Sequence, residues 1–246
     1  MQEMSPVSII VPTLNEEKYL PILLESISKI KYPLEVIIVD GGSTDKTLVV
    51  AEIAKKFFAD AEIVRIIPFG KRGVSRQRNV GASYAVYDTL LFCDADIIAP
   101  TTQEFQFVVS ECIKRELVVT SCRIIPLEKN YVDSCTHAIA FGFQRLMLWL
   151  GKSYFAGGFL LTKKDVFISL GGFDENLRVS EDVDYSLRAA KKGKTALFNI
   201  PIKASTRRFK KYGYGWIVKN PAMLYKLVVR GKLTKKDKVF YPFGEY

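Results

Sequence analysis

The first hundred residues alternate short apolar runs with segments of helical periodicity, and this pattern restricts the fold more than any other feature of the sequence. The runs are rich in Val, Ile and Leu and lack strict polar alternation, which is typical of strands covered on both faces of a parallel sheet. The four runs are Val7–Val11, Leu34–Val39, Ile63–Ile67 and Leu90–Cys93. They predict right-handed βαβ units and an α/β fold with a Rossmann-like, mostly parallel central sheet flanked by helices.

Helices are predicted between these runs. An apolar stripe from Leu20 to Ile30 has helical spacing, and Ser43 is a suitable N-cap for a second helix. A third helix is predicted over Ser75–Tyr87, and Gly81 after Asn79 indicates a close approach of that helix to the sheet.

The second half of the chain has a less regular pattern. Strands are predicted at Leu117–Ile124, at Tyr154–Thr162 with an interruption at Gly157-Gly158, and at Thr195–Ile200. A helix is predicted to begin at Ser180, before two acids that suit its dipole, and to end near Gly193.

The net charge of the 246-residue chain is +10, and its excess of basic residues is confined to one end. Residues 203–246 contain 12 basic and 2 acidic side chains, so residues 1–202 are electrically balanced. The basic side chains of this end alternate with aromatic ones, as in Arg207-Arg208-Phe209-Lys210-Lys211-Tyr212. This composition suits an anionic membrane surface, and it would also suit a nucleic acid.

Hydropathy and cysteine usage predict a cytoplasmic protein. No run of about 18 uncharged apolar residues is present, so a spanning helix is not expected. The first residues lack a basic segment before a long apolar stretch, and Pro12 interrupts them, so a cleaved signal is not expected either. Four cysteines without CxxC spacing are predicted to be buried thiols in a reducing compartment: Cys93, Cys112, Cys122 and Cys135.

Three polar segments follow three of the predicted strands. They are Thr13–Glu16, Asp40–Ser43 and Asp94–Asp96. Because ligands bind outside the carboxyl ends of strands in open α/β sheets, we expect these segments to converge on one crevice. A divalent cation would relieve the repulsion among their acids, and Mg²⁺ or Mn²⁺ suits carboxylate oxygens while leaving positions open for phosphate. The alternatives are ordinary turns in which the acids cap the chain that follows.

Two further charged groups are candidates. Arg72, Arg76 and Arg78 precede the Asp94 segment and with Lys71 could neutralise a diphosphate, although a solvated helix face is an equal alternative for Lys71 and Arg78. Glu181-Asp182 follows a glycine-rich segment, 171–175, which we interpret as a flexible loop. A carboxylate at such a helix entrance is well placed to act as a general base on an incoming hydroxyl, the alternative being a simple helix-dipole partner.

Five segments, in order, resemble the family-2 glycosyltransferases of the GT-A fold. They are Val7–Glu17, Ile38–Asp45, Arg76–Gly81, Phe92–Asp96, and Gly171–Glu175 with Glu181–Asp184. The resemblance implies a nucleotide-binding half over 1–100 and an acceptor half over 101–204 of one domain, followed by a basic extension over 205–246. It also implies an inverting, metal-dependent transfer from a nucleoside-diphosphate sugar.

The resemblance assigns a role to each matching residue. Pro12, Thr13, Glu16 and Asp40 would line the base and ribose pocket; Asp94 would face the ribose or a water of the metal, and Asp96 would coordinate Mg²⁺ or Mn²⁺ on the diphosphate. Asp182 would be the catalytic base, with an ordinary pKa near 4 that keeps it ionised at pH 7. We place Arg76 with the nucleotide, and Glu181, Gly157 and Gly158 on the acceptor side or its loop. A uracil base is favoured. Many relatives carry a second acid where this chain has Gly41, so one potential contact to the base is missing and guanine stays open.

The acceptor is the least constrained part of the prediction. Ala138–Leu150 is strongly apolar but too short to span a bilayer, and we interpret it as a core helix, with a half-exposed helix facing a membrane or a lipid-linked acceptor as the alternative. His137, the single histidine, is expected to be buried or interfacial rather than a metal ligand.

These observations favour an enzyme at the inner face of the cell membrane that uses an acceptor sugar or a polyprenyl-linked acceptor. Two rival classes remain. A nucleic-acid-binding protein would leave the acid-lined body unexplained. A sugar-1-phosphate nucleotidyltransferase would need a glycine-rich basic loop after the first strand, and residues 13–16 are not one.

Overall fold

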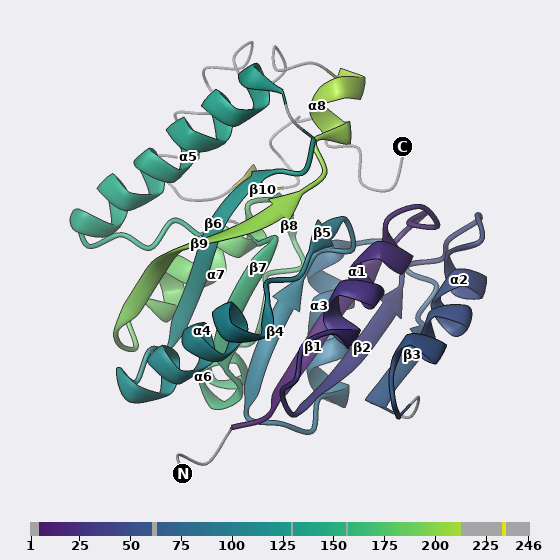
Figure 1. Ribbon diagram of the computed structural model, residues 1–246. Helices are drawn as coiled ribbons and strands as arrows, with labels where there is room; N and C mark the ends of the chain where they lie inside the picture. The colour runs from purple at the N-terminus through teal and green to yellow at the C-terminus, as the bar shows by residue number, and fades with distance from the viewer. Residues whose placement is uncertain (1–4, 61–62, 129, 156, 213–232, 235–246) are drawn as a thin grey trace.

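The computed structural model describes residues 5–60, 63–128, 130–155, 157–212 and 233–234 (Figure 1). Its main sheet has eight strands in the order β3-β2-β1-β4-β7-β6-β9-β5, and β8 and β10 form a separate pair. The strands are β1 (Val7–Thr13), β2 (Leu34–Asp40), β3 (Val64–Pro68), β4 (Thr89–Cys93), β5 (Ile97–Ile98), β6 (Val119–Pro126), β7 (Phe159–Lys163), β8 (Leu177–Val179), β9 (Thr195–Ala204) and β10 (Leu233–Thr234).

The helices are α1 (Leu20–Ser28), α2 (Thr47–Ala54), α3 (Val74–Tyr84), α4 (Thr102–Lys114), α5 (Tyr131–Trp149), α6 (Lys164–Ser169), α7 (Glu181–Ala189) and α8 (Arg207–Tyr212), with a short 3₁₀ turn at Lys55–Phe57. The predicted α/β class is confirmed, because this order alternates strands with helices through most of the described chain.

The first half of the sheet is parallel, as the sequence predicts. β1 pairs with β2 and β4, and β2 pairs with β3, all in parallel register. In this register Thr13 lies opposite Asp40, so the two polar segments that follow β1 and β2 begin at the same edge of the sheet. All seven residues of both strands are buried, which explains their unbroken apolar sequences.

The second half of the sheet is mixed. β7 is antiparallel to both β4 and β6, β9 is parallel to β6, and β5 is antiparallel to the end of β9. The β5–β9 pairing places Ile97 opposite Ala204, so the segment around Asp96 lies beside the end of β9.

Helices cover both faces of the sheet (Figure 1). Side chains of α1, α2 and α4 pack into one apolar core, and those of α3, α6 and α7 pack into the other. The close approach expected at Gly81 is confirmed, because a Cβ at this position would overlap the side chain of Ile10 on β1.

Local polar contacts changed several predicted boundaries. The second helix begins at Thr47 rather than after Ser43, because the Ser43 side chain and amide are engaged by Asp40. Ser180 does precede α7, but it adopts a left-handed conformation (φ 65°) and its side chain makes no capping bond. The helix α4, which the sequence analysis did not predict, begins with a capping box formed by Thr101 and Glu104.

The interpretation of residues 138–150 as a core helix is wrong. They belong to α5, in which only Asp133 and Met147 are buried, so most of this apolar helix lies at the surface.

Three of the four cysteines are buried as predicted, whereas Cys135 on α5 is half-buried; all four are free thiols. Burial raises the pKa of Cys112 to about 12.

Among the described residues, no helix is long and apolar enough to cross a membrane. Most of the basic extension, from residue 213 onward apart from 233–234, lies outside the described residues.

Candidate active site

The three predicted strand-end segments do meet at the carboxyl edge of the sheet. Thr13 Oγ1 donates to Asp40 Oδ1 at 3.1 Å, which joins the ends of β1 and β2. Arg207 at the start of α8 bridges the segments that follow β1 and β4, because its guanidinium pairs with both Glu16 and Asp96. Pro12 and Thr13 are buried beneath this edge.

Asp40 organises the loop after β2. One of its carboxylate oxygens accepts from the amides of Gly42 and Ser43 at 2.9 and 2.8 Å, and the other accepts from the hydroxyls of Thr13 and Ser43. With 1% of its surface exposed, Asp40 shapes the rim of the crevice through the backbone that it holds.

Packing explains why position 41 is a glycine. A Cβ at this position would lie 3.0 Å from Gln77 Oε1 on α3. The amide of Gln77 in turn donates to the carbonyl oxygens of Thr13 and Val39, at 2.7 and 2.8 Å. A side chain at position 41 would therefore press on Gln77, which ties α3 to the ends of two strands.

Arg78 is the central cation of the site, although the sequence analysis selected Arg76. Arg78 is 2% exposed, donates to Asp94 at 2.7 Å and to Glu181 at 2.8 Å, and lies over the ring of Phe173. Arg76 instead pairs with Glu175 at 3.1 Å, and both of these side chains are more than 40% exposed. The two arginines differ because positions two apart on a helix point about 200° apart.

The sequence contains a signal that indicates which of the two arginines, Arg76 or Arg78, faces the core. Gly81 and Ala82 follow Arg78 at spacings of three and four, and both pack against the sheet. Arg78 therefore shares the buried face of α3.

Gly157 and Gly158 lie at the site, between its two groups of acids. The Gly157 amide donates to Asp182 Oδ2 at 2.5 Å, and its carbonyl oxygen accepts from Arg78 at 3.2 Å. The Gly158 carbonyl oxygen accepts from the Asp94 amide at 3.2 Å. A Cβ on Gly157 would come within 2.9 Å of Asp182, so only glycine fits there without displacing that carboxylate.

The pKa of Asp182 is raised by burial, against the expectation of an ordinary value. Arg78 and the amides of Val183 and Gly157 oppose this rise by stabilising the ionised form. Burial, followed by the charge of Asp182, raises the pKa of the neighbouring Glu181 to about 7. Glu181 is therefore a buried partner of Arg78 and Asp182 is half-buried beside it, so these acids are not merely helix-dipole partners.

The glycine-rich loop before α7 is anchored rather than free. Asn79 donates to the Phe173 carbonyl oxygen and accepts from the Phe173 amide, both at 2.9 Å. Phe173 is buried against Phe92, Phe167 and Tyr185. These contacts hold Phe173, in the middle of the segment that the sequence analysis interpreted as a flexible loop, against α3 and the core.

Arg207 was assigned by sequence to the basic extension, yet it lies in the acidic crevice. Its Nη2 is 3.1 Å from Asp96 Oδ2, it also pairs with Glu16, and its guanidinium stacks on Tyr19 at 4.5 Å. The sequence offered no local signal, because Arg207 stands in a run of similar basic residues.

The acids fit a divalent cation that binds together with a diphosphate. Among the described residues no group of three His, Cys, Asp or Glu side chains could hold a metal alone. Asp94 and Asp96 both face cationic partners, which shows that this edge attracts positive charge. Mg²⁺ commonly takes one or two carboxylates and completes its shell with phosphate and water, so Asp96, with Asp94 nearby, is a suitable donor set. His137 lies on α5, where its Nδ1 is 2.8 Å from the Asp133 carbonyl oxygen.

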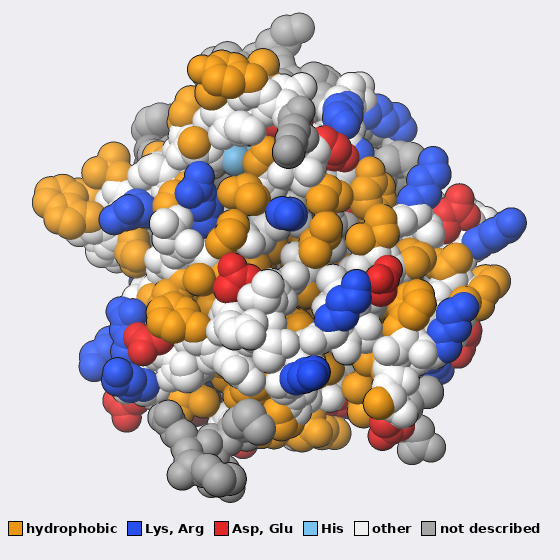
Figure 2. Space-filling model, viewed as in Figure 1, with side chains coloured by type: hydrophobic (Ala, Val, Ile, Leu, Met, Phe, Trp, Pro, Cys, Tyr) orange, Lys and Arg blue, Asp and Glu red, His pale blue; other side chains and the backbone are white. Residues whose placement is uncertain are grey.

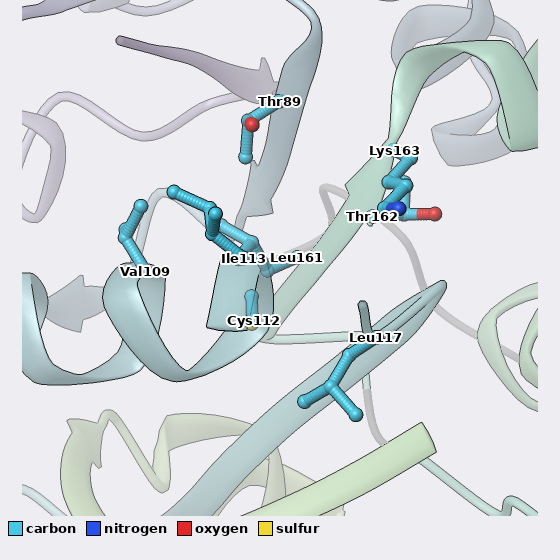
Figure 3. A pocket seen from close by; sticks show the side chains of 8 residues that line it. All are labelled: Thr89, Val109, Cys112, Ile113, Leu117, Leu161, Thr162 and Lys163. Carbon is cyan, nitrogen blue, oxygen red and sulfur yellow. The ribbon is translucent and has the colours of Figure 1, made fainter. Parts of the chain in front are cut away.

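A separate cavity lies beside α4 and has no acidic lining (Figure 3). Its volume is about 30 Å³, and residues from α4, β4 and β7 line it, including Cys112, Thr89 and Leu161. This space holds a few water molecules at most, which is far too small for a nucleotide.

The fold and the acidic crevice define a GT-A-like glycosyltransferase, and the comparisons with known proteins agree. The model for glycosyl transferase family 2 matches residues 8–171. The chain belongs to this family.

Two curated relatives match part of the chain. The 4,4'-diaponeurosporenoate glycosyltransferase of Staphylococcus haemolyticus is 42% identical over 93 residues, which are 37% of this chain and 24% of the relative. The undecaprenyl-phosphate 4-deoxy-4-formamido-L-arabinose transferase of Pectobacterium atrosepticum is 32% identical over 106 residues, which are 41% of this chain and 32% of the relative. The chain thus covers less than a third of the length of each.

Two solved structures share the fold over most of the chain. A mannosyltransferase from Pyrobaculum calidifontis in complex with GDP-Man and Mn²⁺ has a TM-score of 0.70 and 19% identity, covering 97% of this chain and 68% of that one. TarS 1-349 of S. aureus in complex with UDP has a TM-score of 0.63 and 18% identity, covering 82% of this chain and 60% of that one.

Proposed function

We propose that this chain is a metal-dependent, inverting glycosyltransferase that moves a sugar from a nucleoside-diphosphate sugar to an acceptor hydroxyl or phosphate. One observation carries the proposal. The buried Arg78 joins Asp94, which follows β4, to Glu181, the neighbour of Asp182. A donor bound at the strand ends would therefore lie beside a carboxylate that can serve as a base.

The donor pocket is proposed at the carboxyl ends of β1, β2 and β4. Pro12, Thr13, Glu16 and the loop held by Asp40 would surround the base and ribose, and Asp94 would face the ribose. A UDP-sugar is favoured and a GDP-sugar is the alternative, and the two solved structures contain one nucleotide of each kind. Arg76 stays assigned to the nucleotide as a proposal, although its ion pair is with Glu175.

Asp96, with Asp94, would hold Mg²⁺ or Mn²⁺. When bound, the ion stabilises the negative charge that develops on the departing nucleoside diphosphate. Asp182 would accept the proton of the acceptor as its oxygen forms the new bond to the anomeric carbon, from the face opposite the breaking bond. The Gly157 amide would keep Asp182 in position, and Glu181 and Gly158 would border the acceptor side.

The acceptor is proposed to be a sugar or a polyprenyl-linked molecule, the latter supported by the name of the Pectobacterium relative. Residues 205–246 would meet an anionic membrane surface, which places the enzyme at the inner face of the cell membrane. A nucleic-acid partner is disfavoured, because it would leave the acid-lined crevice unexplained.

Calorimetric titration of UDP- and GDP-sugars, with and without Mn²⁺, tests the donor. We expect one of them to bind only with the metal, and Asp96→Ala to abolish that metal dependence. Absence of nucleotide binding would disprove the proposal. Tight RNA binding by the full chain would favour the nucleic-acid alternative, and release of diphosphate from a nucleoside triphosphate and a sugar phosphate would favour the nucleotidyltransferase.

A second measurement tests the base. Asp182→Asn should lower the transfer rate by about 10²–10⁴-fold while donor binding persists. The matched control is Asp165→Asn, which alters an exposed carboxylate in the first turn of α6 and should leave the rate unchanged.

A further inference from the structure

The helix α5 exposes an apolar stripe that runs along its whole length. Val132, Ile139 and Leu146 are 54%, 73% and 52% exposed, and Phe143 and Leu150 are also exposed. At about 100° per residue these five positions lie within about 40° of a single line along the helix. Figure 2 shows hydrophobic side chains at both ends of α5 and between them. Contiguous exposed apolar surface on a folded protein marks an interaction site.

Charged and aromatic residues around the stripe identify the partner. The acid of α5, Asp133, is buried, whereas Arg145 and nearby Lys152 are exposed. Tyr131 and Trp149, at the two ends of the helix, are more than 80% exposed. Apolar side chains flanked by basic and interfacial aromatic residues, without exposed acids, are typical of helices that lie in the plane of an anionic membrane.

We infer that α5 is a membrane-docking helix whose apolar stripe enters the interface of an anionic lipid bilayer. A second copy of this chain fits less well, because α5 offers no exposed acid that could pair with Arg145 of the other copy. A bilayer can take the stripe into its acyl boundary, while Arg145, turned about 140° from Val132 around the helix, stays at the level of the anionic headgroups.

The position of α5 connects this surface to the active site. Thr206 Oγ1 donates to Asp133 Oδ2 at 2.7 Å, and the next residue, Arg207, pairs with Glu16 and Asp96. A docked α5 therefore sets the donor crevice beside the lipid surface. Such a position would let a lipid-linked acceptor reach the crevice, an extension that rests on the proposed function. The docking of α5 itself does not depend on the proposed function.

Sedimentation of the full chain with vesicles tests the inference. The vesicles are phosphatidylcholine alone, or an equal mixture of phosphatidylcholine and phosphatidylglycerol. We expect binding to the mixed vesicles, and about tenfold or greater weakening when Ile139→Ser and Leu146→Ser are combined, because both side chains would leave the acyl boundary. The matched control combines Val49→Ser and Ile53→Ser on α2, where the two side chains are 57% and 53% exposed, and should bind as the unaltered chain does.

Three outcomes would overturn the inference. The first is equal sedimentation of the α5 variant and the unaltered chain. The second is a dimer in the unaltered chain that the α5 variant abolishes, without vesicle binding. The third is a lowered unfolding temperature of the variant with unchanged vesicle binding, which would show that another part of the chain covers the stripe. Calorimetry of nucleotide-sugar binding is carried out on the unaltered chain and on the α5 variant. If both bind the nucleotide sugar but the vesicle results fail, the docking inference is wrong and the proposed function stands.

Discussion

Arg207 Nη2 lies 3.1 Å from Asp96 Oδ2, so the carboxylate best placed to hold a divalent cation is already paired with a cation from the protein. The same guanidinium pairs with Glu16, and the three side chains are at most 13% exposed. A metal that binds Asp96 would compete with this partner for the negative charge of the carboxylate.

Arg207→Met is therefore expected to increase the affinity for Mn²⁺ in the absence of nucleotide, by about tenfold, a difference of about 1.4 kcal/mol. It should also lower the unfolding temperature of the metal-free protein, because two acids lose their buried partner, and added Mn²⁺ should restore it. Calorimetry and thermal unfolding measure the two effects. Lys210→Met is the control, because it removes the same charge from the same helix but from an exposed pair with Glu128. Unchanged Mn²⁺ affinity in Arg207→Met would show that Arg207 does not compete with the metal.

Glu181 should make folding stability depend on pH. Its pKa is raised from 4.5 to about 7 in the folded protein, by burial and then by the charge of Asp182. Between these values the folded protein retains a proton that the unfolded chain has released, so this group's contribution to stability falls as the pH rises from about 4.5 to 7. Glu181→Gln cannot ionise and should lose less stability over this window. Urea unfolding at the two ends of the window measures the difference, and equal slopes in both proteins would refute the assignment.

Gly157→Ala should impair transfer through Asp182. The new Cβ would lie 2.9 Å from Asp182 Oδ2 and 3.0 Å from Arg78 Nη1, so the carboxylate must move. We expect the transfer rate to fall by about 10²-fold with little change in donor affinity, since small displacements of a reacting group are costly. Gly158→Ala is the matched comparison, because its Cβ would make only ordinary contacts, at 3.6 Å or more. A similar loss in both variants would contradict a specific role for the Gly157–Asp182 contact.

Thiol labelling should distinguish Cys135 from the other cysteines. Cys93, Cys112 and Cys122 are buried with raised pKa values, whereas Cys135 is half-buried on the surface helix α5. An aromatic disulfide reagent should therefore modify one thiol rapidly in the native protein and four after denaturation. Cys135→Ser should remove the fast phase, and a fast phase that persists in this variant would mean that a second cysteine is accessible.

The sequence by itself determined the parts of this protein that depend on local pattern. Unbroken apolar runs define β1, β2 and β4 because both faces of these strands are buried, and the polar residues that follow them had to meet at one edge of a parallel sheet. The sequence also proposed Gly157 and Asp182 as site residues, and the structure joins the two through the Gly157 amide.

Tertiary structure decided which charges meet and which surfaces are covered. Arg78 rather than Arg76 reaches the acids because the phase of α3 turns it inward, and Arg207 enters the crevice only because β9 pairs with β5 beside Asp96. An apolar sequence could not show whether α5 was buried, because burial depends on what the rest of the fold places against it. The raised pKa values of Glu181 and Asp182 likewise follow from their enclosure, which no spacing along the chain encodes.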